Sequence, residues 1–214
     1  MVDLYIVRHG RTVWNTQIRM QGRMNSPLTE DGIEGARSLS PEITALPIDK
    51  VLVSPMPRAL QTSYLITSGK FPTTIEPLLS EMDLGDLEGM LRSEAEVLYP
   101  ENYSYFRFEP HKFVPIGDGE SYFDVVERVR RLLRKILVDA PEKGPLLMVS
   151  HMILVQSLLC IIESRDVSTL RSTPFIEQAK LFHIRITPLG DLKFRAQILR
   201  YYGEEYDRTF EFSL

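Results

Sequence analysis

Three short apolar runs in the sequence predict β-strands, and each is followed by side chains that carry a positive charge or an imidazole ring. The runs cover residues 4–7, 51–53 and 146–149. Open α/β sheets bind their ligands beyond the carboxyl ends of their strands. If these three strands are neighbours, their ends bring four side chains to one point, namely Arg8, His9, Arg58 and His151.

Two arginines and two histidines at one point are suited to phosphoryl transfer. Arginine stays charged at any working pH and can bind phosphate through two parallel hydrogen bonds. Arg58 is also predicted in the first turn of a helix, where free N–H groups favour an anion. A phosphoryl group in transfer carries charge on three oxygens, which such cations stabilise, and a neutral histidine can attack phosphorus covalently. The pattern therefore predicts hydrolysis of a phosphomonoester.

The residue pattern gives no reason to expect a cofactor. The chain has four histidines, without a close histidine pair or a dense carboxylate cluster of the kind that binds zinc or calcium. We therefore expect chemistry that uses no metal and no other cofactor.

A series of short motifs follows these residues through most of the chain. They are Arg8-His9-Gly10 with Thr12 and Asn15, Gln21-Gly22, Pro27-Leu28-Thr29 with Gly32, Ser54 with Arg58-Ala59 and Gln61-Thr62, Glu81 with Gly85 and Glu88-Gly89, Gly119-Glu120-Ser121, and Ser150-His151. Each motif is weak alone, but their joint occurrence in this order is specific. With them, the sequence resembles the histidine phosphatase superfamily, also called the phosphoglycerate mutase-like family.

The resemblance implies a role for each matching residue. His9 would be the nucleophile that takes the phosphoryl group, and Glu81 would be the proton donor for the leaving group. Other members of the set would hold the phosphate, namely Arg8, Arg58, Asn15 and the catalytic His151. The Gln21-Gly22 pair would line the substrate pocket. We interpret the two competing donors, Asp83 and Glu88, as surface carboxylates.

Two positions depart from the family pattern. Met152 follows the second histidine, where glycine is usual, and its bulk would narrow the pocket mouth. Arg11 stands where glutamate or glutamine is common, and it either favours anionic substrates or points to water. Both positions leave the size of the substrate open.

Three functions fit these motifs. We favour a metal-independent hydrolase of a small phosphorylated metabolite, with a phosphohistidine intermediate on His9. The first alternative is a bisphosphoglycerate-dependent phosphoglycerate mutase, which would need more basic residues than we expect near the pocket. The second is a non-catalytic module that binds phosphate or phosphoproteins, although binding alone needs neither His9 nor Glu81.

The order of predicted elements indicates an α/β fold in one domain, residues 1–214. We expect a three-layer sandwich with a mostly parallel central sheet, helices on both faces, and a closing hairpin at the sheet edge formed by 181–186 and 192–199. Thr29, Ser54-Pro55 and Ser121 with Asp124 predict helix starts. The aromatic and proline-rich residues at roughly 85–120 predict an irregular or helical lid over the carboxyl ends of the strands. The alternative is an aromatic-rich satellite core with no role in binding.

Composition narrows the partners and the compartment. A net charge of −4 disfavours nucleic acid, and the longest apolar stretch, 152–162, is too short to cross a membrane. The single cysteine, Cys160, is expected to be buried, and the absence of a signal-like start favours a cytoplasmic protein. A homodimer is left open.

The remaining basic residues are expected to face solvent. Those of one amphipathic helix are Arg128, Arg130, Arg131, Arg134 and Lys135. Those outside it are Arg92, Arg107, His111 and Lys112, for which contact with the substrate from the lid is the alternative, and His183, which is expected at an exposed or edge position of a strand.

Overall fold

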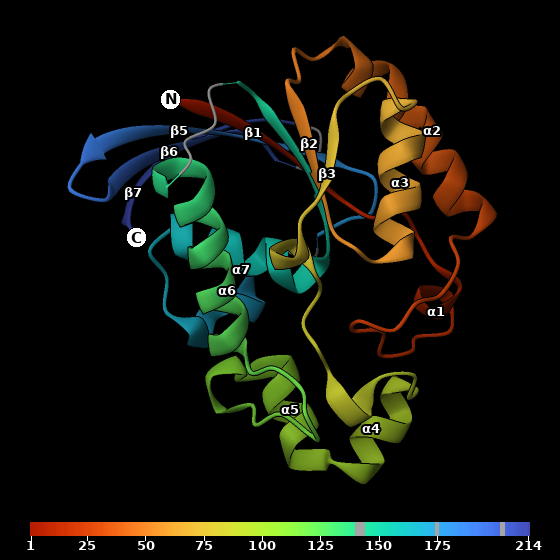
Figure 1. Cartoon of the computed structure of the whole chain (residues 1–214). Coiled ribbons are helices and arrows are strands. Elements are labelled where there is room, and N and C mark those ends of the chain that lie inside the picture. The colour runs from red at the N-terminus through yellow and green to blue at the C-terminus, as the bar shows by residue number, and fades with distance from the viewer. Residues whose placement is uncertain (140–143, 174–175, 202–203) are drawn as a thin grey trace.

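The centre of the protein is a seven-stranded mixed sheet with the strand order β3-β2-β4-β1-β5-β6-β7 (Figure 1). The computed structural model describes residues 1–139, 144–173, 176–201 and 204–214. The strands are β1 Val2–Arg8, β2 Lys50–Val53, β3 Thr73–Ile75, β4 Leu146–Ser150, β5 Leu181–Gly190, β6 Lys193–Tyr201 and β7 Glu204–Ser213. β3, β2, β4 and β1 pair in parallel, whereas β1, β5, β6 and β7 pair antiparallel. The prediction of a mostly parallel sheet is therefore wrong for one half of the sheet.

Helices pack on both faces of this sheet. They are α2 Glu30–Ala45 and α3 Pro57–Thr67 on one face, and α6 Tyr122–Arg134 and α7 Met152–Ile162 on the other (Figure 1). Successive side chains of a strand point to opposite faces. Thus Leu4 and Ile6 of β1 join the core under α6 and α7, while Tyr5 and Val7 join the core under α2 and α3. Burial on both faces explains why the central strands are apolar throughout.

Two of the three predicted helix starts agree with the structure. Thr29 caps α2 by accepting a hydrogen bond from the Gly32 N–H, and Ser121 forms a capping box with Asp124 at the start of α6. The prediction that Ser54-Pro55 begins a helix is wrong. α3 begins two residues later, at Pro57, and the Ser54 hydroxyl instead bonds a histidine of the site described below.

The carboxyl-terminal strands extend the sheet further than the sequence predicted. β5 and β6 form the expected antiparallel hairpin, but β5 pairs with β1 and is interior. The predicted edge position is therefore wrong, because β7 follows as the edge strand. β7 was not expected, since polar residues dominate its sequence and Phe212 is its one fully buried side chain among the residues that the structure describes.

Residues 85–120 form short helices more than irregular structure. The segment contains α4 Arg92–Leu98 and α5 Pro100–Phe108 (Figure 1). The remaining helix, α1 Val13–Thr16, lies between β1 and α2. Buried aromatic rings hold the segment against α6, because Phe106 contacts Phe113 and Tyr122, and the Tyr122 hydroxyl donates to the Phe106 carbonyl at 2.8 Å. Its position is thus set by an aromatic core.

Several solvent-side expectations can be compared with the structure. Cys160 is buried, as predicted, and burial raises the pKa of its thiol. Four basic residues of α6 and the turn after it are exposed, but Arg128 is buried with 5% exposure, so its predicted solvent position is wrong. In the described parts of the chain, no helix is long and apolar enough to cross a membrane.

Candidate active site

The carboxyl ends of β1, β2 and β4 meet at one edge of the sheet. Arg8 is in register with Ser150, and the backbone N–H of His9 donates to the Ser150 carbonyl at 2.9 Å. On the other side of β4, the N–H of Ser54 donates to the Val149 carbonyl at 3.0 Å. These backbone bonds place the segments that follow the three strands side by side, as their positions in the sequence predicted.

His9 is buried, and its ring is oriented by a hydrogen bond to the next residue. Its Nδ1 lies 2.7 Å from the Gly10 carbonyl oxygen, which can only accept, so we infer that Nδ1 carries the proton. In the neutral ring Nε2 then keeps its lone pair. Burial, and after it the charges of Arg58 and Arg8, lower the pKa of His9 well below its ordinary value. A neutral ring with an unprotonated Nε2 is the form in which histidine is a nucleophile.

His151 lies against His9, with their ring centroids 5.1 Å apart. An Nη of Arg58, which can only donate, lies 3.2 Å from its Nδ1, and the Ser54 hydroxyl lies 2.7 Å from its Nε2. We infer that Nδ1 accepts and that Nε2–H donates to Ser54. Because both ring nitrogens are hydrogen-bonded, the imidazole is fixed by Ser54 and in turn holds the Arg58 guanidinium in place.

Arg8, at the end of β1, and Arg58, in the first turn of α3, are both almost fully buried. An Nη of Arg8 donates to the Ile176 carbonyl at 2.5 Å, and those of Arg58 donate to the Met24 and Gly22 carbonyls at 2.7 and 2.6 Å. Burial lowers the pKa of each guanidinium to about 10. Both therefore remain charged at neutral pH, and the buried Nε of Arg58 has no hydrogen-bond partner among the described residues.

Two glycines allow the loops to approach this closely. A Cβ on Gly10 would lie 2.7 Å from the Gly32 carbonyl oxygen, so the start of α2 could not pack against the end of β1. Gly22 has φ +51°, and a Cβ there would collide with the Glu88 carboxylate. Both positions exclude a side chain for steric reasons.

Glu88 and Asp83 hold the walls of the site and are not the surface carboxylates that we expected. Both are half-buried. Glu88 accepts backbone N–H groups of Arg23, Met24 and Leu84 at 2.6, 2.8 and 3.1 Å. The Asp83 carboxylate pairs with the Arg23 guanidinium at 3.1 Å.

A pocket of about 70 Å³ opens beside these groups. The expected residues that line it are Arg8, His9, Asn15, Gln21, Gly22, Arg58 and Glu81. Asn15 and Thr12 cap each other's backbone, and the Thr12 hydroxyl donates to Gln21 Oε1 at 3.2 Å. The buried Nε2 of Gln21 is a second donor without a partner among the described residues. The lining thus presents buried donors that an anion can satisfy.

The charge of the pocket is strongly positive. Six arginines and one carboxylate, that of Glu81, belong to the described lining. Arg92 is exposed, as expected, and Arg107 is half-buried, but both also line the pocket. Arg171 and Arg19 were not singled out from the sequence. Met152 also lines the pocket, whereas the exposed Arg11 does not.

Glu81 is fixed at the start of α7. Its Oε1 accepts from the Met82 N–H at 3.0 Å and its Oε2 from the Ile153 N–H at 3.3 Å. The carboxylate is 9% exposed and reaches the pocket that His9 lines. A carboxyl held there can exchange a proton with a group bound next to His9.

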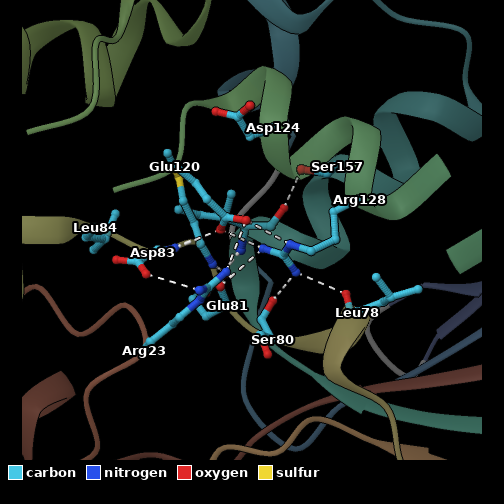
Figure 2. A network of polar contacts seen from close by, with 12 residues as sticks. Arg23, Leu78, Ser80, Glu81, Asp83, Leu84, Glu120, Asp124, Arg128 and Ser157 are labelled. Carbon is cyan, nitrogen blue, oxygen red and sulfur yellow. Dashed lines mark hydrogen bonds and ion pairs between the residues drawn. The ribbon is translucent and has the colours of Figure 1, made fainter. Parts of the chain in front are cut away.

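Arg128 organises the chain around Glu81 (Figure 2). Its guanidinium donates to the carbonyls of Leu78, Ser80 and Glu81 at 3.0, 2.6 and 3.2 Å, and it pairs with the Glu120 carboxylate at 2.8 Å. Glu120 in turn accepts the Asp83 N–H at 2.9 Å. One buried arginine thus fixes the backbone on both sides of Glu81.

Replacing Arg128 with methionine should destabilise the protein and misplace Glu81. Loss of the buried cation removes the donor of three carbonyls and one of the partners of the Glu120 carboxylate, which costs on the order of 3 kcal/mol of unfolding free energy. In the folded variant, turnover of alkyl phosphates should fall more than turnover of p-nitrophenyl phosphate, because only the alkyl leaving group needs a proton. Arg131→Met, on the exposed side of α6, is the control. Equal losses for both esters would show that Arg128 is structural only.

The stability of the unliganded protein should depend on pH through the two buried histidines. The pKa of each lies well below 6.5 in the folded chain, owing first to burial and then to Arg58. Below about pH 6.5 the unfolded chain therefore binds more protons than the folded chain. As the pH is lowered, the free energy of unfolding decreases by at most about 1.4 kcal/mol per pH unit for each histidine. Urea titrations from about pH 7 to about pH 5 measure this slope. The double variant His9→Gln/His151→Gln should flatten it, and an unchanged slope would contradict the assignment.

Comparison with known proteins gives the family of this chain. Residues 4–193 match the model of the histidine phosphatase superfamily, branch 1. The chain belongs to the histidine phosphatase superfamily. The fold agrees, since this histidine phosphatase superimposes on Bacillus stearothermophilus YhfR with a TM-score of 0.83 and 31% identity, covering 87% of this chain and 92% of that one.

Two relatives of this histidine phosphatase carry different names. It is 32% identical over 169 residues to phosphoserine phosphatase 1 of Hydrogenobacter thermophilus, covering 78% of this chain and 79% of that protein. It is 35% identical over 156 residues to the probable phosphoglycerate mutase GpmB of Cronobacter sakazakii, covering 71% and 70%. This chain is therefore an enzyme of the histidine phosphatase superfamily.

Proposed function

We propose that the protein hydrolyses a small phosphomonoester without a metal, through a phosphohistidine on His9. The observation that carries the proposal is the position of the His9 ring in a buried, positively charged pocket, with Nδ1 bonded to the Gly10 carbonyl. That bond leaves Nε2 as the free nitrogen. A carboxyl for proton transfer, Glu81, lines the same pocket.

The reaction takes two steps on these residues. In the first, Nε2 of His9 attacks phosphorus, the bond to the ester oxygen breaks, and Glu81 gives its proton to the leaving alkoxide. In the second, the Glu81 carboxylate takes a proton from water, the water oxygen attacks phosphorus, and the N–P bond breaks to release inorganic phosphate. Arg8 and Arg58 stabilise the charge on the phosphoryl oxygens in both steps. His151 keeps Arg58 in place, and Asn15, Gln21 and Gly22 complete the wall of the phosphate pocket.

The segment 85–120 would select among substrates. It contributes Arg92, Phe106 and Arg107 to the lining, so the part of the substrate beyond the phosphate would contact this segment. Met152 lines the pocket and the adjoining cavity, and its bulk favours small esters over bulky ones.

Hydrolysis of p-nitrophenyl phosphate in excess chelator tests the proposal. We expect turnover at mildly acidic to neutral pH, and no turnover would instead favour a module that only binds phosphate. A mutase would convert 3-phosphoglycerate to its 2-isomer when primed with 2,3-bisphosphoglycerate. Isomer formation that exceeds phosphate release would overturn the assignment as a hydrolase.

A further inference from the structure

The guanidinium of Arg58 is placed by a short loop, residues 21–26, called here the Gly22 loop. Its Nη groups donate to the carbonyls of Gly22 and Met24 at 2.6 and 2.7 Å, and one of them also lies 3.2 Å from Nδ1 of His151. Its Nε is buried and has no hydrogen-bond partner in the described parts of the chain. The position of this guanidinium therefore depends on the position of the loop.

The Gly22 loop has no helix or strand of its own and is held mainly through its backbone. The side chains of Arg23 and Met24 are exposed, so the core does not fix the loop at these positions. Arg23 forms ion pairs with Asp83 and Glu120 at 3.1 Å (Figure 2), but such exposed pairs contribute little. The N–H groups of Arg23 and Met24 both donate to the Glu88 carboxylate, at 2.6 and 2.8 Å. Hydrogen bonds to a charged acceptor are the stronger kind, so Glu88 is the main support of the loop.

One peptide group of the loop is hydrogen-bonded at both ends. The peptide between Gly22 and Arg23 gives its N–H to Glu88, and its carbonyl accepts from Arg58. A trans peptide is planar, and its N–H and C=O point in opposite directions. The carboxylate and the guanidinium therefore lie at opposite ends of one rigid unit. Hydrogen bonds arranged in a chain also strengthen one another, so the carboxylate makes this carbonyl a better acceptor for Arg58.

Glu88 is itself anchored on another segment of the chain. Its Oε1 also accepts the Leu84 N–H at 3.1 Å, and the N–H of the next residue, Gly89, donates to the Met20 carbonyl at 2.8 Å. Its side chain occupies the space that the missing Cβ of Gly22 leaves. Glu88 does not belong to the described lining of the pocket. It is thus built into the wall behind the loop and does not touch the substrate.

The charge of Glu88 also acts on Arg58. Burial lowers the pKa of Arg58 to about 10, and the negative charges of Glu81 and Glu88 oppose that lowering. Glu81 lines the pocket, whereas Glu88 lies outside it. Glu88 therefore helps to keep the guanidinium charged without competing with a bound anion inside the pocket.

We propose that Glu88 is a positioning residue for the phosphate site, which acts on Arg58 through the peptide between Gly22 and Arg23. The carboxylate fixes the peptide, and the peptide holds the guanidinium in the place where it meets the phosphoryl oxygens. Donors fixed in advance stabilise charge well, because they need not rearrange during the reaction. This role of Glu88 rests on the proposed function, since it assumes that Arg58 binds the phosphate to be transferred.

The affinity for inorganic phosphate measures the effect on Arg58. Titration calorimetry should give a dissociation constant at least about tenfold higher for Glu88→Ala than for the wild-type protein. Glu88→Gln keeps one acceptor oxygen and should show a smaller rise, and it carries the test if the alanine variant does not fold. Glu94→Gln is the matched control and should bind phosphate as the wild type does. Glu94 is exposed, and its carboxylate also accepts a backbone N–H, that of Leu91 at 2.6 Å.

The choice between esters separates an effect on Arg58 from a general loosening of the site. The ratio of turnover between an alkyl phosphate and p-nitrophenyl phosphate reports on Glu81. It should stay at the wild-type value in Glu88→Gln, whereas Arg128→Met should lower it. Wild-type affinity for phosphate in the folded Glu88 variants would refute the role of Glu88. A ratio lowered as in Arg128→Met would also refute it, because Glu88 would then act on the proton donor.

The same measurements distinguish this role from the proposed function. If the wild-type protein hydrolyses phosphomonoesters while the Glu88 variants bind phosphate normally, the role of Glu88 fails alone. If phosphate binding depends on Glu88 but no ester is hydrolysed, the hydrolase fails alone. A wild-type protein that does not bind phosphate would contradict both.

Discussion

The His9→Ala variant should lose turnover of every phosphomonoester by several orders of magnitude, because the described lining of the pocket holds no second imidazole, thiol or hydroxyl to take the phosphoryl group. His9 is 3% exposed, and its ring faces the cavity lined by Arg8 and Arg58. The loss should appear in kcat, since the arginines that bind phosphate remain. Phosphate release measured with p-nitrophenyl phosphate and with an alkyl phosphate gives the size of the effect.

The control for this variant is another histidine of the chain. His111→Ala removes an exposed ring that does not line the pocket, and it should retain wild-type turnover. If His9→Ala kept a substantial part of the activity while folded, the nucleophile would have to be another group or water.

The Glu81→Gln variant should separate esters by their leaving groups. Glutamine keeps the size of the side chain but cannot donate a proton in the way that a carboxylic acid does. A positioned general acid typically contributes ~10²–10⁴ in rate when the leaving alkoxide needs a proton. We therefore expect a loss of about this size for glycerol phosphate and a small loss for p-nitrophenyl phosphate, whose phenolate leaves without help.

Asp83→Asn is the matched control for the proton donor. Asp83 lies two residues from Glu81, pairs with Arg23 and does not line the pocket. Its loss should affect both esters alike, through the position of the chain. If Glu81→Gln also reduced both esters equally, Glu81 would not be the donor.

The part of the site that was predictable from sequence is the part held by strand ends. Arg8, His9 and His151 directly follow apolar runs, and parallel strands bring such positions together by their register alone. Arg58 was predictable for the same reason, one turn further along the chain. The error at Ser54-Pro55 changes the start of α3 without moving Arg58 out of its first turn.

Arg128 was missed although the sequence carries a signal for it. It falls on the apolar stripe of α6, three residues after Val125 and four before Leu132. An arginine on such a stripe must be buried, and burial requires partners. Its carbonyl partners lie about 50 positions away in sequence, at 78–81, so the pattern predicts burial but not which groups it binds.

Nothing in the local sequence predicted that three further arginines line the pocket. Arg92, Arg107 and Arg171 lie on short elements whose positions depend on tertiary packing, through the aromatic contacts of Phe106 and the Gln156 amide. Helical spacing does not predict such contacts. The expectation of few basic residues near the pocket is therefore wrong, because six arginines belong to its described lining.

The position of the phosphoryl group during turnover tests the central claim most directly. The wild-type enzyme is mixed with a phosphomonoester labelled in its phosphate, quenched with alkali during steady turnover, digested, and mapped by mass spectrometry. We predict an acid-labile phosphate on His9, which is absent from the His9→Ala variant. A label on serine or aspartate, or a label that persists in His9→Ala, would contradict the account.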